Sequence, residues 1–293
     1  MSMATSPPKH SPAQPHPLLR ALTARPHAAV MGILNVTPDS FSDGGAFLDP
    51  SAAMAHAKTM IAAGADILDI GAESTRPYGG ALPVSAEDEL ARLRAILPAV
   101  AALGTPVSID SMKAQVTAWA LDHGAAMAND VWGLQRDNAM ARVIAERKAP
   151  VVVMHNRDAA DPAIDIMKDI AAFFARSLEI AAKAGIPDSH IVLDPGIGFG
   201  KTPQQSMAVL ARLDELGKFG LPVLVGASRK RFIDTVAPSK PQQRLGGSLA
   251  AHLLAAERGA AIIRAHDVKE TVQALKVQAA ITAAGKGTIG NGR

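Results

Sequence analysis

Short apolar segments and longer amphipathic segments alternate along most of the chain. Eight of the short segments are almost continuously hydrophobic, which is typical of parallel strands that are covered on both faces. They are residues 30–36, 67–71, 107–110, 126–130, 151–155, 191–194, 223–226 and 261–264.

The segments between these strands are rich in Ala and Leu at helical spacing. Ser51 and Ser85 are candidate N-caps of two of the helices. Glycine stands shortly before five of the strands, where a helix should end, at Gly64, Gly104, Gly124, Gly185 and Gly259. Eight strand–helix repeats in one stretch predict an α/β protein with a single closed (β/α)8 TIM barrel. An open doubly wound sheet is the alternative.

We expect one barrel domain over residues 27–285, between two loose ends. Residues 1–26 carry six prolines and no apolar run of the kind found in a signal peptide, so we expect a disordered extension. Removal of residues 1–25 should then leave the melting temperature and the turnover nearly unchanged. The glycine-rich residues 286–293 are expected to form a flexible tail.

Composition excludes several classes of protein. The 293 residues contain no cysteine, which excludes disulfides, thiolate metal sites and a cysteine nucleophile and is compatible with the cytoplasm. The 30 basic and 27 acidic residues are interspersed along the chain, so we expect no nucleic-acid partner. No apolar stretch approaches the roughly 18 residues of a membrane span, so we expect no membrane partner.

Polar residues collect where the predicted strands end, and this is the end of a TIM barrel that carries active sites. Each residue alone is more often a cap, a turn former or a structural histidine. Their convergence on one rim is what favours a binding site, at Asn35, Arg76, Asp110, Asn129, His155, Asp194, Lys230, Arg264 and His266.

These side chains divide by chemistry. Asp110, Asn129 and Asp194 offer acceptors for the N–H edge of a flat heterocycle. The cationic residues, Lys230 and Arg264 among them, suit phosphate oxygens. The chain has no Ser-His-Asp order, zinc spacing or Walker A loop, so we expect chemistry without a covalent enzyme intermediate on a small phosphate-bearing substrate.

Two long loops resemble the signature loops of dihydropteroate synthases. They are residues 35–45 (NVTPDSFSDGG) and 73–77 (ESTRP). Further motifs of that family follow in its order, at residues 108–111, 128–130, 154–155, 194–200, 228–230, 247–249 and 264–268. The resemblance extends over the whole barrel, from about residue 28 to residue 283.

The resemblance implies a transferase of folate biosynthesis. Such an enzyme condenses 6-hydroxymethyl-7,8-dihydropterin diphosphate with 4-aminobenzoate to 7,8-dihydropteroate and releases diphosphate. The resemblance also implies Mg2+, a homodimer, and sulfonamides as inhibitors that compete with 4-aminobenzoate. Two alternatives stay open: a pterin-dependent methyltransferase on the same barrel, and a paralogue that binds pterin without turnover.

The resemblance also assigns roles to residues of this chain. It places the pterin on Asp110, Asn129, Asp194 and Lys230. Arg264 and His266 would bind the diphosphate, and Asn35 would ligate Mg2+. We expect Lys230, Arg264 and Asp110 to be the catalytic residues. The aminobenzoate site would be formed by Thr37, Pro38, Phe41, Thr75, Arg76, Phe199 and Lys230. Where the family often has a serine after the lysine, this chain has Arg231.

Overall fold

Eight parallel strands form a closed barrel in the computed structural model, which describes residues 14–37, 50–73 and 84–286. The strands follow one another around the ring in chain order, and β1 pairs with both β2 and β8. The strands are β1 (Ala29–Asn35), β2 (Ile67–Gly71), β3 (Val107–Asp110), β4 (Met127–Asp130), β5 (Val151–Met154), β6 (Ile191–Asp194), β7 (Val223–Val225) and β8 (Ala260–Ala265).

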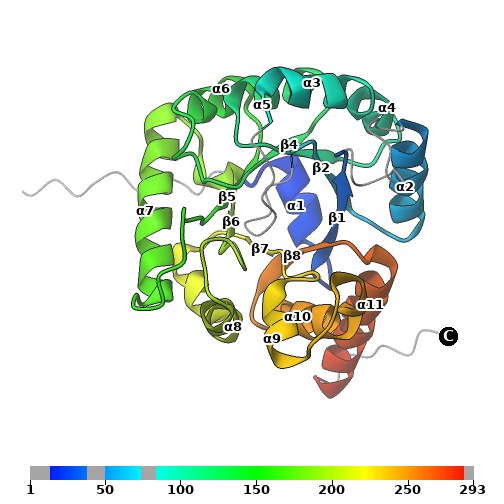
Figure 1. Ribbon diagram of the computed structural model, residues 1–293, viewed down its shortest axis with the longest axis vertical. Coiled ribbons are helices and arrows are strands. Elements are labelled where there is room, and N and C mark those ends of the chain that lie inside the picture. The colour runs from blue at the N-terminus through cyan, green and yellow to red at the C-terminus, as the bar shows by residue number, and fades with distance from the viewer. Residues whose placement is uncertain (1–13, 38–49, 74–83, 287–293) are drawn as a thin grey trace, which may run out of the picture.

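Helices surround this ring on the outside, except for the first, α1 (Pro17–Thr23), which lies in the middle of the ring in Figure 1. The α-helices are α1 (Pro17–Thr23), α2 (Pro50–Ala62), α3 (Ala86–Arg94), α4 (Leu97–Ala101), α5 (Ala114–Asp122), α6 (Met140–Arg147), α7 (Ile166–Ala184), α8 (Pro203–Ala211), α9 (Arg231–Val236), α10 (Leu245–Glu257) and α11 (Val268–Gly285). Three 3-10 helices complete the described elements: η2 (Asp188–His190), η3 (Leu213–Phe219) and η4 (Pro241–Gln243).

The barrel prediction is confirmed, and the open sheet is excluded because β1 and β8 pair. Every predicted strand is present, with ends that differ by no more than one residue. Ser85 caps α3 by accepting a hydrogen bond from the Asp88 N–H at 3.1 Å. The prediction for Ser51 is wrong, because α2 already begins at Pro50. All five predicted helix-stop glycines have positive φ.

Two apolar layers hold the barrel together. Alternate residues of a strand face opposite sides of a sheet, so each strand contributes to both layers. One layer lies between the strands and the outer helices. The other fills the barrel near the N-terminal ends of its strands and includes Met31, Ile67, Met127, Val192 and Ile262.

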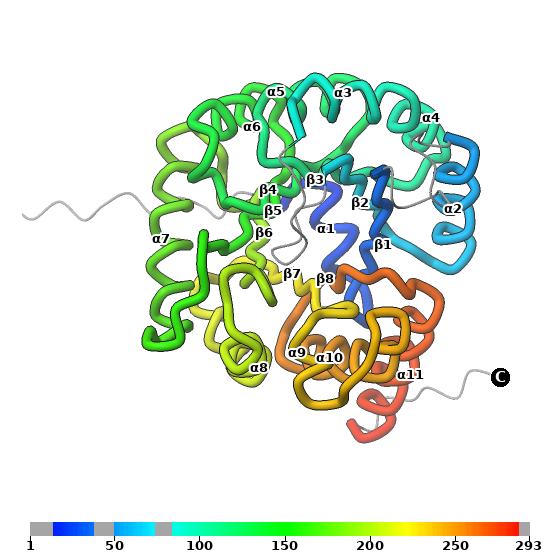
Figure 2. The backbone as a smooth tube through the Cα atoms, in the orientation of Figure 1, coloured from blue at the N-terminus to red at the C-terminus, as the bar shows by residue number. Residues whose placement is uncertain are grey.

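Helix α1 covers the inner layer at the N-terminal end of the barrel, and Figure 2 shows it in the middle of the ring of strands. Its Leu19 and Leu22 are 2% and 3% exposed and pack with the residues inside the barrel. The helix begins with Pro17, and the His16 side chain accepts a hydrogen bond from the Leu18 N–H at 3.2 Å.

The expectation of a disordered extension over residues 1–26 therefore needs a correction. Pro17–Thr23 is an ordered helix, because two leucines three positions apart present one apolar face to the open end of the barrel. Residues 1–13 and 287–293 lie outside the described residues. Among the helices of the described ranges, none is long and apolar enough to cross a membrane.

Candidate active site

The inside of the barrel changes from apolar to polar along its strands. Side chains two positions apart point the same way, so each apolar residue of the inner layer predicts where the next inward side chain lies. The pairs are Ile67 and Asp69, Met127 and Asn129, Val192 and Asp194, and Ile262 and Arg264. The C-terminal end of the barrel is thus lined by buried polar and charged groups.

Arg264 lies at the centre of these groups and joins three strands. Its Nε donates to Asp69 Oδ2 at 2.6 Å, and its Nη2 donates to Asp110 Oδ2 at 2.7 Å. Asn129 Nδ2 donates to the same Asp69 oxygen at 3.0 Å. The guanidinium side chain is 17% exposed and both carboxylates are buried, so these are charge-assisted bonds in a poorly hydrated place.

Burial perturbs the carboxylates of this site. It raises the pKa of Asp110, and the charge of Arg264 offsets part of this effect. Burial also raises the pKa of Asp194 to about 6, offset in part by the Gly196 N–H and by Lys230 and Arg264. Hydrogen-bond donors of a ligand would stabilise the charged forms of both groups.

Three acceptor oxygens at this end have no hydrogen-bond partner among the described residues. They are Asp69 Oδ1, Asp110 Oδ1 and Asn129 Oδ1. A buried polar atom without a partner costs roughly 1–3 kcal/mol. Three of them on neighbouring strands indicate a place built for the N–H groups of a ligand.

The loop after β6 brings an aromatic ring beside a cation. Asp194 Oδ1 accepts a hydrogen bond from the Gly196 N–H at 2.7 Å, which starts the turn. Further along the same turn, the Phe199 ring lies under Lys230, with Nζ 4.0 Å from the ring centroid. The β6 and β7 loops therefore meet over the polar end of the barrel.

The loop after β7 is held by groups from two later elements. Ser228 Oγ lies 3.0 Å from His266 Nδ1, after β8. Arg229 has φ +58°, an unfavourable backbone conformation for a residue with a side chain, and its N–H donates to Ser248 Oγ at 2.9 Å. Ser248 thus explains the motif at residues 247–249, because it fixes the turn that presents Lys230.

Comparison with known proteins identifies the family. Residues 31–266 match the family described as "Pterin binding enzyme". A dihydropteroate synthase of Bacillus subtilis is 43% identical over 262 residues, which cover 89% of this chain and 91% of the relative. The chain belongs to the dihydropteroate synthase family. Members of this family are transferases, so the chain is an enzyme of that class.

Solved structures of the family support this assignment. The dihydropteroate synthase of Clostridium difficile, crystallised with pteroic acid, is 46% identical with a TM-score of 0.84 and covers 87% of this chain and 97% of its own. The Yersinia pestis dihydropteroate synthase with a sulfonamide drug is 43% identical with a TM-score of 0.81 and covers 88% and 95%. The resemblance inferred from the two loops is confirmed.

Glu73, at the base of the second signature loop, is held by a hydrogen bond and an ion pair. Glu73 Oε1 accepts a hydrogen bond from the Val84 N–H at 3.0 Å, which joins the two described ends of the loop. Lys113 Nζ pairs with Glu73 and, at 2.7 Å, with Glu89. Burial raises the pKa of Glu89, and Lys113 offsets part of this effect.

The structure places most of the predicted site residues at one end of the barrel. They are Asp110, Asn129, Asp194, Phe199, Lys230, Arg264 and His266, with Asn35 and Thr37 at the end of β1. Pro38, Phe41, Thr75 and Arg76 lie outside the described residues. The binding and catalytic roles of all these residues stay predictions.

Sequence reasoning missed Asp69 and Lys201. Asp69 lies in the middle of β2, not at its end, so an inspection of strand ends passes over it. The signal that could have revealed Asp69 is its spacing, because it lies two positions after the inward-facing Ile67, just as Asn129 lies two positions after Met127. Lys201 directly follows the motif at residues 194–200, and its contact with His155 comes from a distant segment.

Proposed function

We propose that this chain condenses 6-hydroxymethyl-7,8-dihydropterin diphosphate with 4-aminobenzoate to give 7,8-dihydropteroate and diphosphate. The observation that carries the proposal is the set of acceptor oxygens on Asp69, Asp110 and Asn129 that have no partner among the described residues and lie beside the cation of Arg264. A pterin has several N–H groups on one edge, and its diphosphate is anionic. Acceptors for the pterin N–H groups and a cation for the diphosphate therefore lie together at one end of the barrel.

The pterin would bind to Asp110, Asn129 and Asp194. Carboxylates accept hydrogen bonds from N–H groups more strongly than neutral oxygens do, and burial strengthens the effect. The raised pKa of Asp194, about 6, fits a carboxylate that awaits such donors. Asp69 would hold Asn129 and Arg264 in place through the hydrogen bonds that it accepts from them.

Catalysis would consist mainly of helping the diphosphate leave. The C–O bond between the pterin methylene and the diphosphate breaks, and the amine nitrogen of 4-aminobenzoate forms the new C–N bond to that methylene. The amine then loses a proton, and no strong base is needed because the aniline nitrogen is already neutral. Arg264 and His266 would stabilise the leaving anion, and Lys230 would lie between the two substrates.

The metal implied by the family fits the donors of this site. Among the described residues no group of three or more His, Cys, Asp or Glu side chains could hold a metal ion. The carbonyl oxygen of Asn35, at the end of β1, is a hard donor of the kind that Mg2+ accepts. Bound there together with substrate oxygens and water, Mg2+ would neutralise charge on the diphosphate.

Phe199, Lys230 and Thr37 would form the described part of the aminobenzoate site, together with Pro38, Phe41, Thr75 and Arg76. Sulfonamides should then compete with 4-aminobenzoate. The Yersinia pestis relative with a bound sulfonamide supports this expectation. The homodimer, the cytoplasmic location and the lack of a nucleic-acid partner stay predictions.

The experiment is diphosphate release by the full-length chain with Mg2+ and both substrates. We expect release, together with formation of 7,8-dihydropteroate, and no product when 4-aminobenzoate is left out. Pterin binding without diphosphate release would support a paralogue without turnover. Methyl transfer to or from a pterin without diphosphate release would support the methyltransferase.

A further inference from the structure

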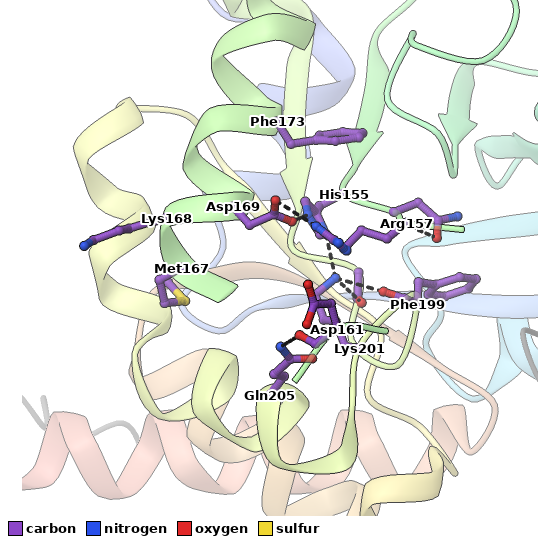
Figure 3. Close-up of polar contacts among 12 residues, drawn as sticks. His155, Arg157, Asp161, Met167, Lys168, Asp169, Phe173, Phe199, Lys201 and Gln205 are labelled. Carbon is purple, nitrogen blue, oxygen red and sulfur yellow. Dashed lines mark hydrogen bonds and ion pairs between the residues drawn. The ribbon is translucent and has the colours of Figure 1, made fainter. Parts of the chain in front are cut away.

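Lys201 carries its side-chain amino group into the interior of the molecule beside the site, where burial lowers its pKa to about 7 and the charges of Asp194 and Asp169 offset part of this effect. It follows the β6 loop, and the residue is only 1% exposed. Its Nζ donates to the carbonyl oxygens of Gly196 at 2.9 Å and Phe199 at 3.1 Å. The same nitrogen lies 2.6 Å from His155 Nδ1 (Figure 3). One ammonium thus joins both ends of the turn to the end of β5.

The contacts continue from His155 to helix α7. His155 Nε2 lies 2.9 Å from Asp169 Oδ2, and Arg157 Nη1 pairs with the other oxygen of Asp169 at 2.9 Å. Because Lys201 donates to Nδ1, the proton of a neutral His155 is on Nε2 and is donated to Asp169. Burial lowers the pKa of His155, and the charge of Lys201 adds to this, so the imidazole is neutral.

The turn at residues 196–200 packs closely against the segment that contains His155 and Arg157. A Cβ added at Gly196 would lie 2.0 Å from the carbonyl oxygen of His155, and one at Gly200 would lie 2.4 Å from the Cβ of Arg157. Both glycines have positive φ. The turn therefore lies too close to its neighbour for side chains of its own at these positions, and Lys201 supplies donors for its carbonyls.

The two functional residues of this loop depend on Lys201 to different degrees. Asp194 belongs to β6, where it pairs with Met154, and its carbonyl oxygen accepts the His155 N–H at 2.8 Å. Phe199 lies beyond the strand, and its carbonyl oxygen accepts a hydrogen bond from Lys201. Loss of the ammonium should therefore displace Phe199 and the neighbouring Lys230 more than Asp194.

We propose that Lys201, supported by His155 and Asp169, is a positioning residue that sets the Phe199–Lys230 contact for the second substrate. The proposal rests on the proposed function, because it assigns that contact to 4-aminobenzoate. Lys201 would touch neither substrate. It would act through the shape of the turn that it closes.

The first test is Lys201→Met, which keeps the length of the side chain and removes its charge. Loss of charge-assisted hydrogen bonds should raise the KM for 4-aminobenzoate about tenfold or more, whereas the KM for the pterin diphosphate stays within about twofold. The matched control is Lys168→Met, because the Lys168 side chain is 86% exposed on α7 next to Asp169. We expect both KM values of the control to equal those of the wild type.

A second pair of variants decides the matter if Lys201→Met fails to fold. Asp169→Ala removes the acceptor of the His155 Nε2–H, whereas Asp169→Asn retains an oxygen in its place. We expect Asp169→Ala to raise the KM for 4-aminobenzoate and Asp169→Asn to restore most of the wild-type value. Equal KM values in wild type and Asp169→Ala would overturn the proposal.

A folded Lys201→Met variant with an unchanged KM for 4-aminobenzoate would also overturn the proposal. Equal rises in the KM for 4-aminobenzoate and the KM for the pterin diphosphate would overturn it as well. Failure of the proposed function would look different. In that case the wild type itself would release no diphosphate when both substrates are present.

Discussion

The two ends of the barrel are made from the same strands but from different side chains. At the N-terminal end, the inward positions are apolar and the helix α1 covers them with Leu19 and Leu22. At the C-terminal end, Arg264 lies between the buried carboxylates of Asp69 and Asp110, and acceptor oxygens have no partner in the described part of the chain. One end contributes mainly to stability, and we propose that the other gives up some stability for binding.

The largest effect on stability is expected at the polar end, in Arg264→Met. This change leaves Asp69 and Asp110 buried without their cation, which should lower the free energy of unfolding by about 3–5 kcal/mol and abolish most activity. Urea denaturation measures the change. The control is Arg258→Met, because Arg258 pairs with Asp214 at the exposed surface and should lose less than about 1 kcal/mol. Equal losses in both variants would contradict the role of Arg264 as the buried partner of two carboxylates.

Leu22→Ala should produce the next effect, at the apolar end. Truncation of a buried leucine costs about 2–5 kcal/mol of unfolding free energy, and kcat and both KM values of the folded enzyme should not change. Denaturation and steady-state kinetics test the two parts. Val236→Ala is the control, because Val236 is 68% exposed. A stability loss no larger than that of Val236→Ala would show that α1 does not close the barrel.

Asp194→Asn should raise stability at neutral and alkaline pH. The folded pKa of Asp194, about 6, is raised above its ordinary value of 3.8 by burial. Its contribution to stability is therefore complete below about pH 4 and is lost as the pH rises through about 6. At pH 8 the ligand-free variant should melt about 2–4 °C above the wild type.

Asp110 and Asp130 also have raised pKa values, so the variant should retain part of the dependence on pH. Asp158→Asn is the matched control, because that side chain is 81% exposed. A variant that melts below the wild type at pH 8 would refute the argument that the ionised Asp194 is costly without a ligand.

The smallest effect is expected for Arg231→Ser. Arg231 is exposed and begins α9, directly after Lys230. We expect its side chain to point to solvent, so the KM for 4-aminobenzoate should change less than about twofold, since even a partly exposed ion pair is worth only about 0.5–1 kcal/mol. A rise of about fivefold or more in that KM would instead indicate a pair between the guanidinium and the carboxylate of 4-aminobenzoate.

Sequence reasoning predicted the two ends unequally. The strands were predictable because parallel strands covered on both faces are almost continuously apolar. Asp110 and Asp194 were predictable because they end strands, and Asn129 because it is the last residue but one of its strand. Asp69 was missed because it is a single carboxylate inside an apolar strand. Its hydrogen bond with Arg264, which comes from another strand, exists only in the folded barrel.

The sequence also misled us at the apolar end. Six prolines in residues 1–26 favoured disorder, and the spacing of Leu19 and Leu22 was overlooked. Those leucines are stable in a helix only because the barrel opening accepts them, which is a tertiary effect. Lys201 shows the same limit, since its partner His155, and Asp169 that contacts His155 in turn, lie in other segments of the chain.

Binding of the pterin diphosphate with Mg2+, measured by calorimetry without 4-aminobenzoate, tests most directly the claim that the polar end forms the active site. Replacing the buried carboxylate in Asp194→Asn should weaken binding roughly 10- to 150-fold. Leu22→Ala, at the other end, should bind within about twofold of the wild type. Binding by Asp194→Asn that equals the wild type, or an equal loss in Leu22→Ala, would contradict the account.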